Sequence, residues 1–167
     1  MASNIVHVNW RGPFIVEDVI KNYNKEGEDH GIYQIYGNHP VYGRDSLIYI
    51  GIAKDDTFSE RFKVHERIWL IEQDYVPVEV YLGEVYRQTG EEEREEDDFQ
   101  TDTEWKYHIE LCEKLLIFAL VPSLNIQNKE SINEMKLRDL HILNWGHRAD
   151  LPPEVSVERW TYKYGRK

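Results

Sequence analysis

The sequence is poor in the residues that build several common kinds of site. Among 167 residues there is one cysteine, Cys112, which excludes an intramolecular disulfide and any zinc site made of several cysteines. No apolar run approaches the roughly 20 residues that cross a bilayer, and the N-terminus lacks the basic start and apolar run of a signal peptide. We therefore expect a cytoplasmic protein that does not enter a membrane.

Positive charge is also scarce. The chain carries 20 Lys and Arg against 31 Asp and Glu, a net charge of −11, which disfavours nucleic acid as a partner. Much of the acidic excess lies in residues 91–98, a run of the kind that usually forms a solvated loop. Cations gather elsewhere, as in the segment with Arg61, Lys63 and Arg67. The charge balance weakens the expectation of nucleic-acid binding and leaves it open.

Apolar residues make up 41% of the chain and aromatic residues 13%, enough for a folded core. The patterns predict strands over 5–10, 31–36, 47–51 and 76–85, helices over 14–23, 58–71 and 104–119 (the last capped by Thr103), and a strand or short helix over 135–145. This order predicts an α+β fold in a single domain, with a small three-stranded antiparallel sheet flanked by helices. The core would span residues 31–125, with an N-terminal βα extension (1–30) and a C-terminal one (126–167).

Two tripeptides and three later features form an ordered pattern. Gly-Ile-Tyr at 31–33 opens one predicted strand, and Tyr-Ile-Gly at 49–51 closes its neighbour. Arg61 and His65 follow on a helix, and then come Glu113 with Leu-Leu-Ile at 115–117, Pro122, and Asn125 twelve residues after the glutamate. In order and spacing, residues 31–125 resemble the GIY-YIG nuclease superfamily. The histidine at position 65 resembles its restriction-endonuclease branch, since other branches carry tyrosine there.

The resemblance implies a divalent-metal-dependent endonuclease that hydrolyses DNA phosphodiester bonds. Glu113 would bind Mg²⁺ (with Mn²⁺ as a substitute), a hard cation that often takes only one or two protein carboxylates. Arg61 would clamp the phosphate, because a guanidinium stays charged and matches phosphate oxygens in pairs. Tyr33 would be the general base, which needs a nearby partner because a free phenol has a pKa near 10. Tyr49 would position the water or the phosphate.

Several further residues have two interpretations. His65 shares a helix face with Arg61 and is either an active-site helper or an ordinary surface residue. Many family members carry a lysine where this chain has Ile52, and Lys54 would stand in for it. Lys63 and Arg67 are expected to bind substrate. Asn125 is a candidate substrate ligand, although a structural bond to loop backbone is the more common role.

Other functions remain as alternatives. The tyrosines could be core aromatics, and the chain could be a weakly active or inactive nucleic-acid-binding or repair module, as the loss of lysine at Ile52 suggests. The acidic run 91–98 alone favours a DNA mimic. A symmetric homodimer would let one active site in each subunit cut one strand of a DNA duplex.

Overall fold

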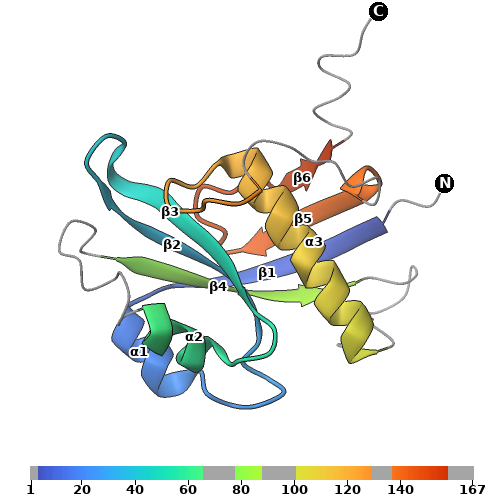
Figure 1. Ribbon diagram of the computed structural model, residues 1–167, viewed down its shortest axis with the longest axis horizontal. Helices are drawn as coiled ribbons and strands as arrows, with labels where there is room; N and C mark the ends of the chain where they lie inside the picture. The colour runs from blue at the N-terminus through green and yellow to red at the C-terminus, as the bar shows by residue number, and fades with distance from the viewer. Residues whose placement is uncertain (1–3, 66–77, 88–100, 129–136, 158–167) are drawn as a thin grey trace, which may run out of the picture.

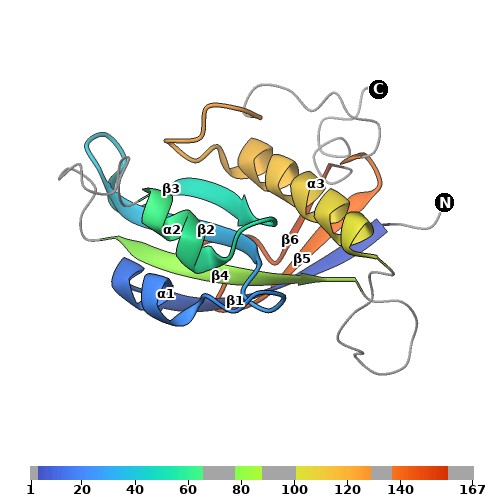
Figure 2. The same cartoon turned by 60° about the horizontal axis from the view of Figure 1, so that its bottom comes forward.

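The fold is built on one mixed sheet of six strands. The computed structural model describes residues 4–65, 78–87, 101–128 and 137–157. The strands are β1 (Asn4–Phe14), β2 (Gly31–His39), β3 (Gly43–Ala53), β4 (Glu79–Tyr86), β5 (Leu140–Gly146) and β6 (Glu154–Ser156); the helices are α1 (Val16–Asn22), α2 (Phe58–His65) and α3 (Asp102–Leu120). The sheet order is β3-β2-β4-β1-β5-β6, and the sheet curls into a half-barrel (Figure 2).

The expected small three-stranded antiparallel sheet is wrong. Strands β3, β2 and β4 do pair antiparallel, but β4 also pairs with β1, and β1 pairs parallel with β5. Parallel neighbours need a long crossover, here most of the chain, and no local pattern reveals such a pairing. The strands that were assigned to the two extensions thus lie inside the sheet. The division into a core of 31–125 and two extensions stays a prediction.

The two faces of the sheet carry separate apolar cores. Helix α3 covers one face, where Val6, Val8 and Trp10 of β1 pack with apolar residues of α3 and β5. Helices α1 and α2 lie together on the other face, over Tyr33 and Leu82 (Figure 1). Alternation along the strands explains the division, because successive side chains point to opposite faces. The site described below depends on which face each residue occupies.

Several local predictions need adjustment. Helix α3 starts earlier than expected, because Thr101 rather than Thr103 is its N-cap and accepts a hydrogen bond from the Glu104 backbone N–H at 3.1 Å. Strand β1 continues beyond the predicted range of 5–10, through Gly12-Pro13 to Phe14, with an irregular register against β4. The mixed segment 135–145 contains strand β5. The acidic run 91–98, Arg67 and residues 66–71 of the second predicted helix lie outside the described residues.

In the part of the chain that the structure describes, no helix is long and apolar enough to cross a membrane.

Candidate active site

The two tyrosines of the sequence pattern lie on one face of the β2–β3 pair. Tyr33 pairs with Gly51, so alternation places Tyr33, Gly51 and Tyr49 on the face that α2 covers. The rings of Tyr33 and Tyr49 have their centroids 6.2 Å apart. A Cβ at Gly51 would overlap the hydroxyl end of Tyr33. The glycine therefore leaves the space that the Tyr33 hydroxyl occupies, which explains why these two motif residues stand opposite each other.

Tyr33 forms a short hydrogen bond with His65 on α2. Tyr33 Oη lies 2.6 Å from His65 Nε2, and Tyr33 is fully buried. Burial raises the pKa of Tyr33, while burial and the neighbouring Arg61 lower the pKa of His65 to about 4. At neutral pH the phenol therefore keeps its proton and the imidazole is neutral, so Tyr33 O–H donates to His65 Nε2. His65 is thus a buried site residue rather than an ordinary surface histidine.

Arg61 lies one helical turn before His65, beside both tyrosines. Helix α2 begins with a capping box, in which the Thr57 backbone N–H donates to Glu60 Oε2 at 2.8 Å and the Glu60 N–H donates to Thr57 Oγ1 at 3.4 Å. This fixes where the helix starts and so where Arg61 points. Its charge opposes the burial that raises the pKa of Tyr33 and Tyr49. Arg61 Nε is buried and has no hydrogen-bond partner among the described residues.

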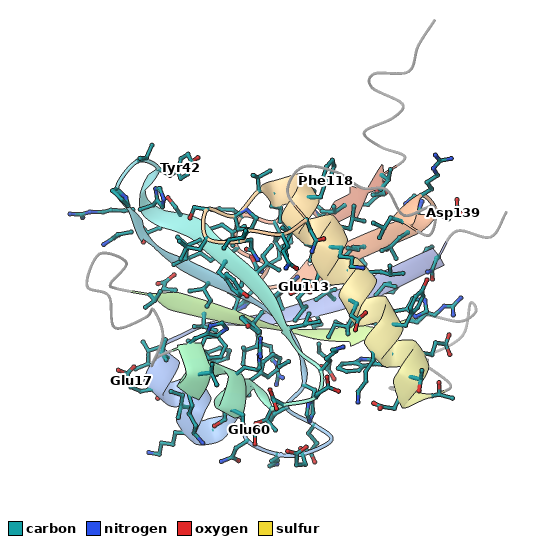
Figure 3. The ribbon with its side chains drawn as sticks, viewed as in Figure 1. Glu17, Tyr42, Glu60, Glu113, Phe118 and Asp139 are labelled. Atoms are coloured by element: carbon teal, nitrogen blue, oxygen red, sulfur yellow. The ribbon has the colours of Figure 1, made fainter. Side chains whose placement is uncertain are left out.

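Glu113 projects from α3 toward the same cluster (Figure 3). Burial raises the pKa of its carboxyl to about 7, Glu110 adds to the rise, and Arg61 opposes it. Glu113 in turn raises the pKa of both Tyr33 and Tyr49, so its charge reaches them. The described residues contain no group of three or more His, Cys, Asp or Glu side chains placed to hold a metal ion. A metal here would have one protein carboxylate and water or phosphate oxygens.

The residues nevertheless fit a hard divalent cation with a phosphate. A buried carboxylate whose pKa is raised by burial gains most when a cation arrives, because the cation offsets the loss of solvation. The Arg61 guanidinium, on a side chain that is 36% exposed, supplies donors for a phosphate oxygen in the same place. Mg²⁺ commonly binds through one or two carboxylates together with substrate phosphate. The donor set is therefore the sparse kind that Mg²⁺ uses at phosphate-transfer sites.

Lys54 lies close to Glu113 but is already paired. Its ammonium forms a hydrogen-bonded ion pair with Glu110, one turn before Glu113 on α3, and lies 3.8 Å from Asp55. The bond to Glu110 raises the pKa of Lys54. Ile52, in the position that the lysine of many family members occupies, packs against the other core, on the α3 face. Glu110 was not among the predicted site residues, although its i,i+3 spacing from Glu113 places the two carboxylates on one side of the helix.

Asn125 holds strand β3 in place. Its side-chain Oδ1 accepts from the Ile50 backbone N–H at 2.9 Å, and its Nδ2 donates to the Ile50 carbonyl at 2.8 Å. Ile50 is the residue between Tyr49 and Gly51, so Asn125 positions the strand that carries both. The buried amide is engaged with backbone, which makes a positioning role the better account than direct substrate binding.

Of the remaining predicted substrate ligands, Lys63 is described and lies on the exposed side of α2. The structure therefore brings Tyr33, Tyr49, Arg61, His65 and Glu113 into one cluster, with Lys54 and Asn125 at its border. No protein-family model, curated protein or solved structure matches this chain.

Proposed function

We propose that this cluster is the active site of a metal-dependent endonuclease that hydrolyses DNA phosphodiester bonds. The observation that carries the proposal is the juxtaposition of four groups from three elements, β2, α2 and α3: the Tyr33–His65 pair, the half-buried Arg61, and Glu113 with its raised pKa. A hydrolase of phosphate esters needs a proton acceptor, a cation for the phosphate and a ligand for a divalent ion. The cluster has one group suited to each task.

The Tyr33–His65 pair explains how a phenol, which is a weak base, can accept a proton from the attacking water. Tyr33 cannot ionise readily, because burial raises its pKa. It can instead pass a proton: the attacking water gives a proton to Tyr33 Oη as Tyr33 gives its own to His65 Nε2 at 2.6 Å. The resulting hydroxide bonds to phosphorus, the bond from phosphorus to the leaving oxygen breaks, and that oxygen takes a proton from solvent. The negative phosphate favours a protonated His65 and so assists the transfer.

Arg61 and Glu113 would serve the phosphate. Arg61 donates to non-bridging oxygens, where negative charge gathers in the transition state. A divalent cation bound by Glu113 would supply further charge neutralisation at those oxygens. Tyr49, half-buried beside His65 with ring centroids 5.3 Å apart, orients the phosphate or the water from the open side of the cluster. Cleavage of both strands of a duplex by a homodimer stays a prediction.

The test is cleavage of supercoiled and linear DNA with Mg²⁺ or Mn²⁺ by the wild type and by Glu113→Gln. Glutamine keeps the size of the side chain and removes the charge that a metal ligand needs. We expect metal-dependent cutting by the wild type, loss of cutting in Glu113→Gln, and retained DNA binding in both. A folded wild type that cuts no substrate with either metal would overturn the proposal and favour the inactive binding module.

A further inference from the structure

Three aromatic side chains form a row across strands β4, β1 and β5, away from the catalytic cluster. We call Tyr86, His7 and Trp145 the aromatic row. The His7 ring lies within 16° of parallel to Tyr86, with centroids 5.1 Å apart, and within 12° of parallel to Trp145, with centroids 6.0 Å apart. These residues come from strands that run side by side in the sheet (Figure 1). The three rings thus share one orientation.

The orientation of Trp145 is fixed by a hydrogen bond. Trp145 Nε1 donates to His7 Nδ1 at 2.8 Å, and His7 is buried, with 6% of its surface exposed. Trp145 is 49% exposed. Packing alone does not explain why a large ring is held rigidly by a buried partner and left half in solvent, because the exposed half contributes no hydrophobic stabilisation. Rigid, accessible rings are suited to stacking on a flat partner.

The aromatic row lies on the same face of the sheet as Tyr33. Tyr33 pairs with Leu82 on β4, and Leu82 pairs with Arg11 on β1, so these three side chains point to one side. Two residues along β1 from Arg11, Asn9 pairs with Trp145. Neighbouring strands lie about 4.8 Å apart, so Trp145 is roughly 14 Å across the sheet from β2.

A cation lies on the same face of β1, two residues from the Asn9 that pairs with Trp145. Arg11 is exposed, and its guanidinium carbon lies 5.7 Å from the centre of the Tyr23 ring at the end of α1. Glu84 pairs with Asn9 on the same face and is also exposed. Its negative charge would keep a phosphate away from Glu84. A strand of nucleic acid would therefore pass its backbone along Arg11 and set a base on Trp145.

We propose that Trp145, held by His7, is a stacking site for an unpaired base of the nucleic acid that the catalytic cluster cuts. The proposal rests on the proposed function only in taking nucleic acid as the ligand. A half-exposed indole and an exposed arginine two residues along the neighbouring strand, on the same face of the sheet, match a base joined to a phosphate. Paired bases inside a duplex present their edges rather than their faces, so the site selects single-stranded or locally opened substrate.

Binding to three labelled probes tests this site. The measurements use the Glu113→Gln variant, which is expected to leave the probes uncut. The probes are a single-stranded thymidine 12-mer, the same length of abasic strand, and a 12-base-pair duplex, each followed by fluorescence anisotropy without metal. Trp145→Ala should weaken binding of the thymidine strand about tenfold, because stacking on an aromatic side chain contributes about 1–3 kcal/mol per base. Trp145→Phe, which keeps a ring, should stay within about threefold of the parent. Binding of the abasic strand and the duplex should not change.

Two results would overturn the stacking site: unchanged affinity of Trp145→Ala for the thymidine strand, or an equal loss for thymidine and abasic strands. Equal unfolding temperatures of the variants ensure that the fold is not the cause. Failure of this site is distinguishable from failure of the nuclease. Cleavage that requires Glu113 with no effect of Trp145 removes only the stacking site, whereas Trp145-dependent binding by a protein that cuts nothing removes only the nuclease.

Discussion

Two regions of the molecule each contain a buried asparagine, and the two asparagines have different hydrogen-bond partners. In the candidate active site, Asn125 bonds both backbone groups of Ile50 and so fixes the strand that carries Tyr49 and Gly51. In the region around β1 and β5, Asn144 accepts from Trp10 Nε1 at 2.9 Å and donates to the Pro152 carbonyl at 2.9 Å. The first asparagine fixes strand β3, and the second joins β1 to β5 and to the segment before β6.

The surroundings of the two asparagines differ in the same way. In the candidate active site that Asn125 borders, polar groups have shifted pKa values. The pKa of Glu113 is raised to about 7 and that of His65 is lowered to about 4, in both cases chiefly by burial. Around Asn144 the neighbours are the apolar Trp10 and a backbone carbonyl. Buried groups with shifted pKa values are a cost to the fold and cluster at sites that carry chemistry. The difference therefore separates a region whose buried polar groups have shifted pKa values from a region whose buried amide is paired with an indole N–H and a backbone carbonyl.

The largest expected effect is at Arg61. We expect Arg61→Ala to lower the rate of DNA cleavage by about 10³-fold, because a donor aimed at developing negative charge contributes about that much. Arg61→Lys should recover little, since an ammonium cannot bind two oxygens in the same geometry. Lys21→Ala, a loss of the same charge from the exposed last turn of α1, is the control and should change the rate little. Single-turnover cleavage measures all three, and equal losses at both positions would contradict the assignment.

The two asparagines give the next largest effect. Asn125→Ala and Asn144→Ala should each lower the free energy of unfolding by about 2 kcal/mol, because each leaves buried groups without their partners. Only Asn125→Ala should also slow cleavage per folded molecule, by about tenfold, because β3 would shift under Tyr49. Urea unfolding and single-turnover cleavage separate the two results. If both variants slow cleavage equally, the two regions are not distinct in function.

The pH dependence of stability tests the burial of Glu113. Its pKa is about 7 in the fold against 4.5 as a free side chain, so the folded protein holds a proton that the unfolded chain releases between these values. Stability due to this group is present below pH 4.5 and is lost as the pH rises to about 7. In chelator we expect Glu113→Gln to be more stable than the wild type by about 2 kcal/mol at pH 8 and no more stable at pH 4.5. Urea unfolding at both pH values gives the difference, and equal differences would contradict the raised pKa.

The smallest effect concerns Glu110. Its carboxylate raises the pKa of Glu113, so Glu110→Gln should lower that pKa and move the pH midpoint of cleavage downward by about half a unit. The freed Lys54 would act in the same direction. An upward shift of the midpoint, measured from the cleavage rate against pH, would show that the Lys54–Glu110 pair does not act on Glu113.

The catalytic region could be predicted from the sequence further than the rest of the fold. Tyr33, Tyr49 and Arg61 lie in one short stretch with strand, turn and helix signals, so local spacing determines much of their relation. Glu113 required the longer motif, because its helix follows β4. The bond between Tyr33 and His65 could not be anticipated in detail, since it depends on how α2 crosses the sheet.

The sheet itself could not be predicted. The pairing of β1 with β5 joins residues such as Val6 and Ile142, and no local pattern encodes the partner of a strand that far away. Strand β1 was recognised as a strand, but its place between β4 and β5 follows from tertiary packing of Trp10 and its neighbours. The prediction of a three-stranded sheet failed for that reason, while the predicted types of most described elements held.

The central claim is tested most directly by the single-turnover rate of DNA cleavage in Mg²⁺ between pH 5.5 and 9, after removal of metal with a chelator and its restoration. The account predicts no cutting without the metal, and a rate that rises about tenfold per pH unit below about pH 7 and then levels, as Glu113 loses its proton. Cutting that persists in chelator, a rate that does not change with pH, or no cutting by the folded protein would each contradict the claim.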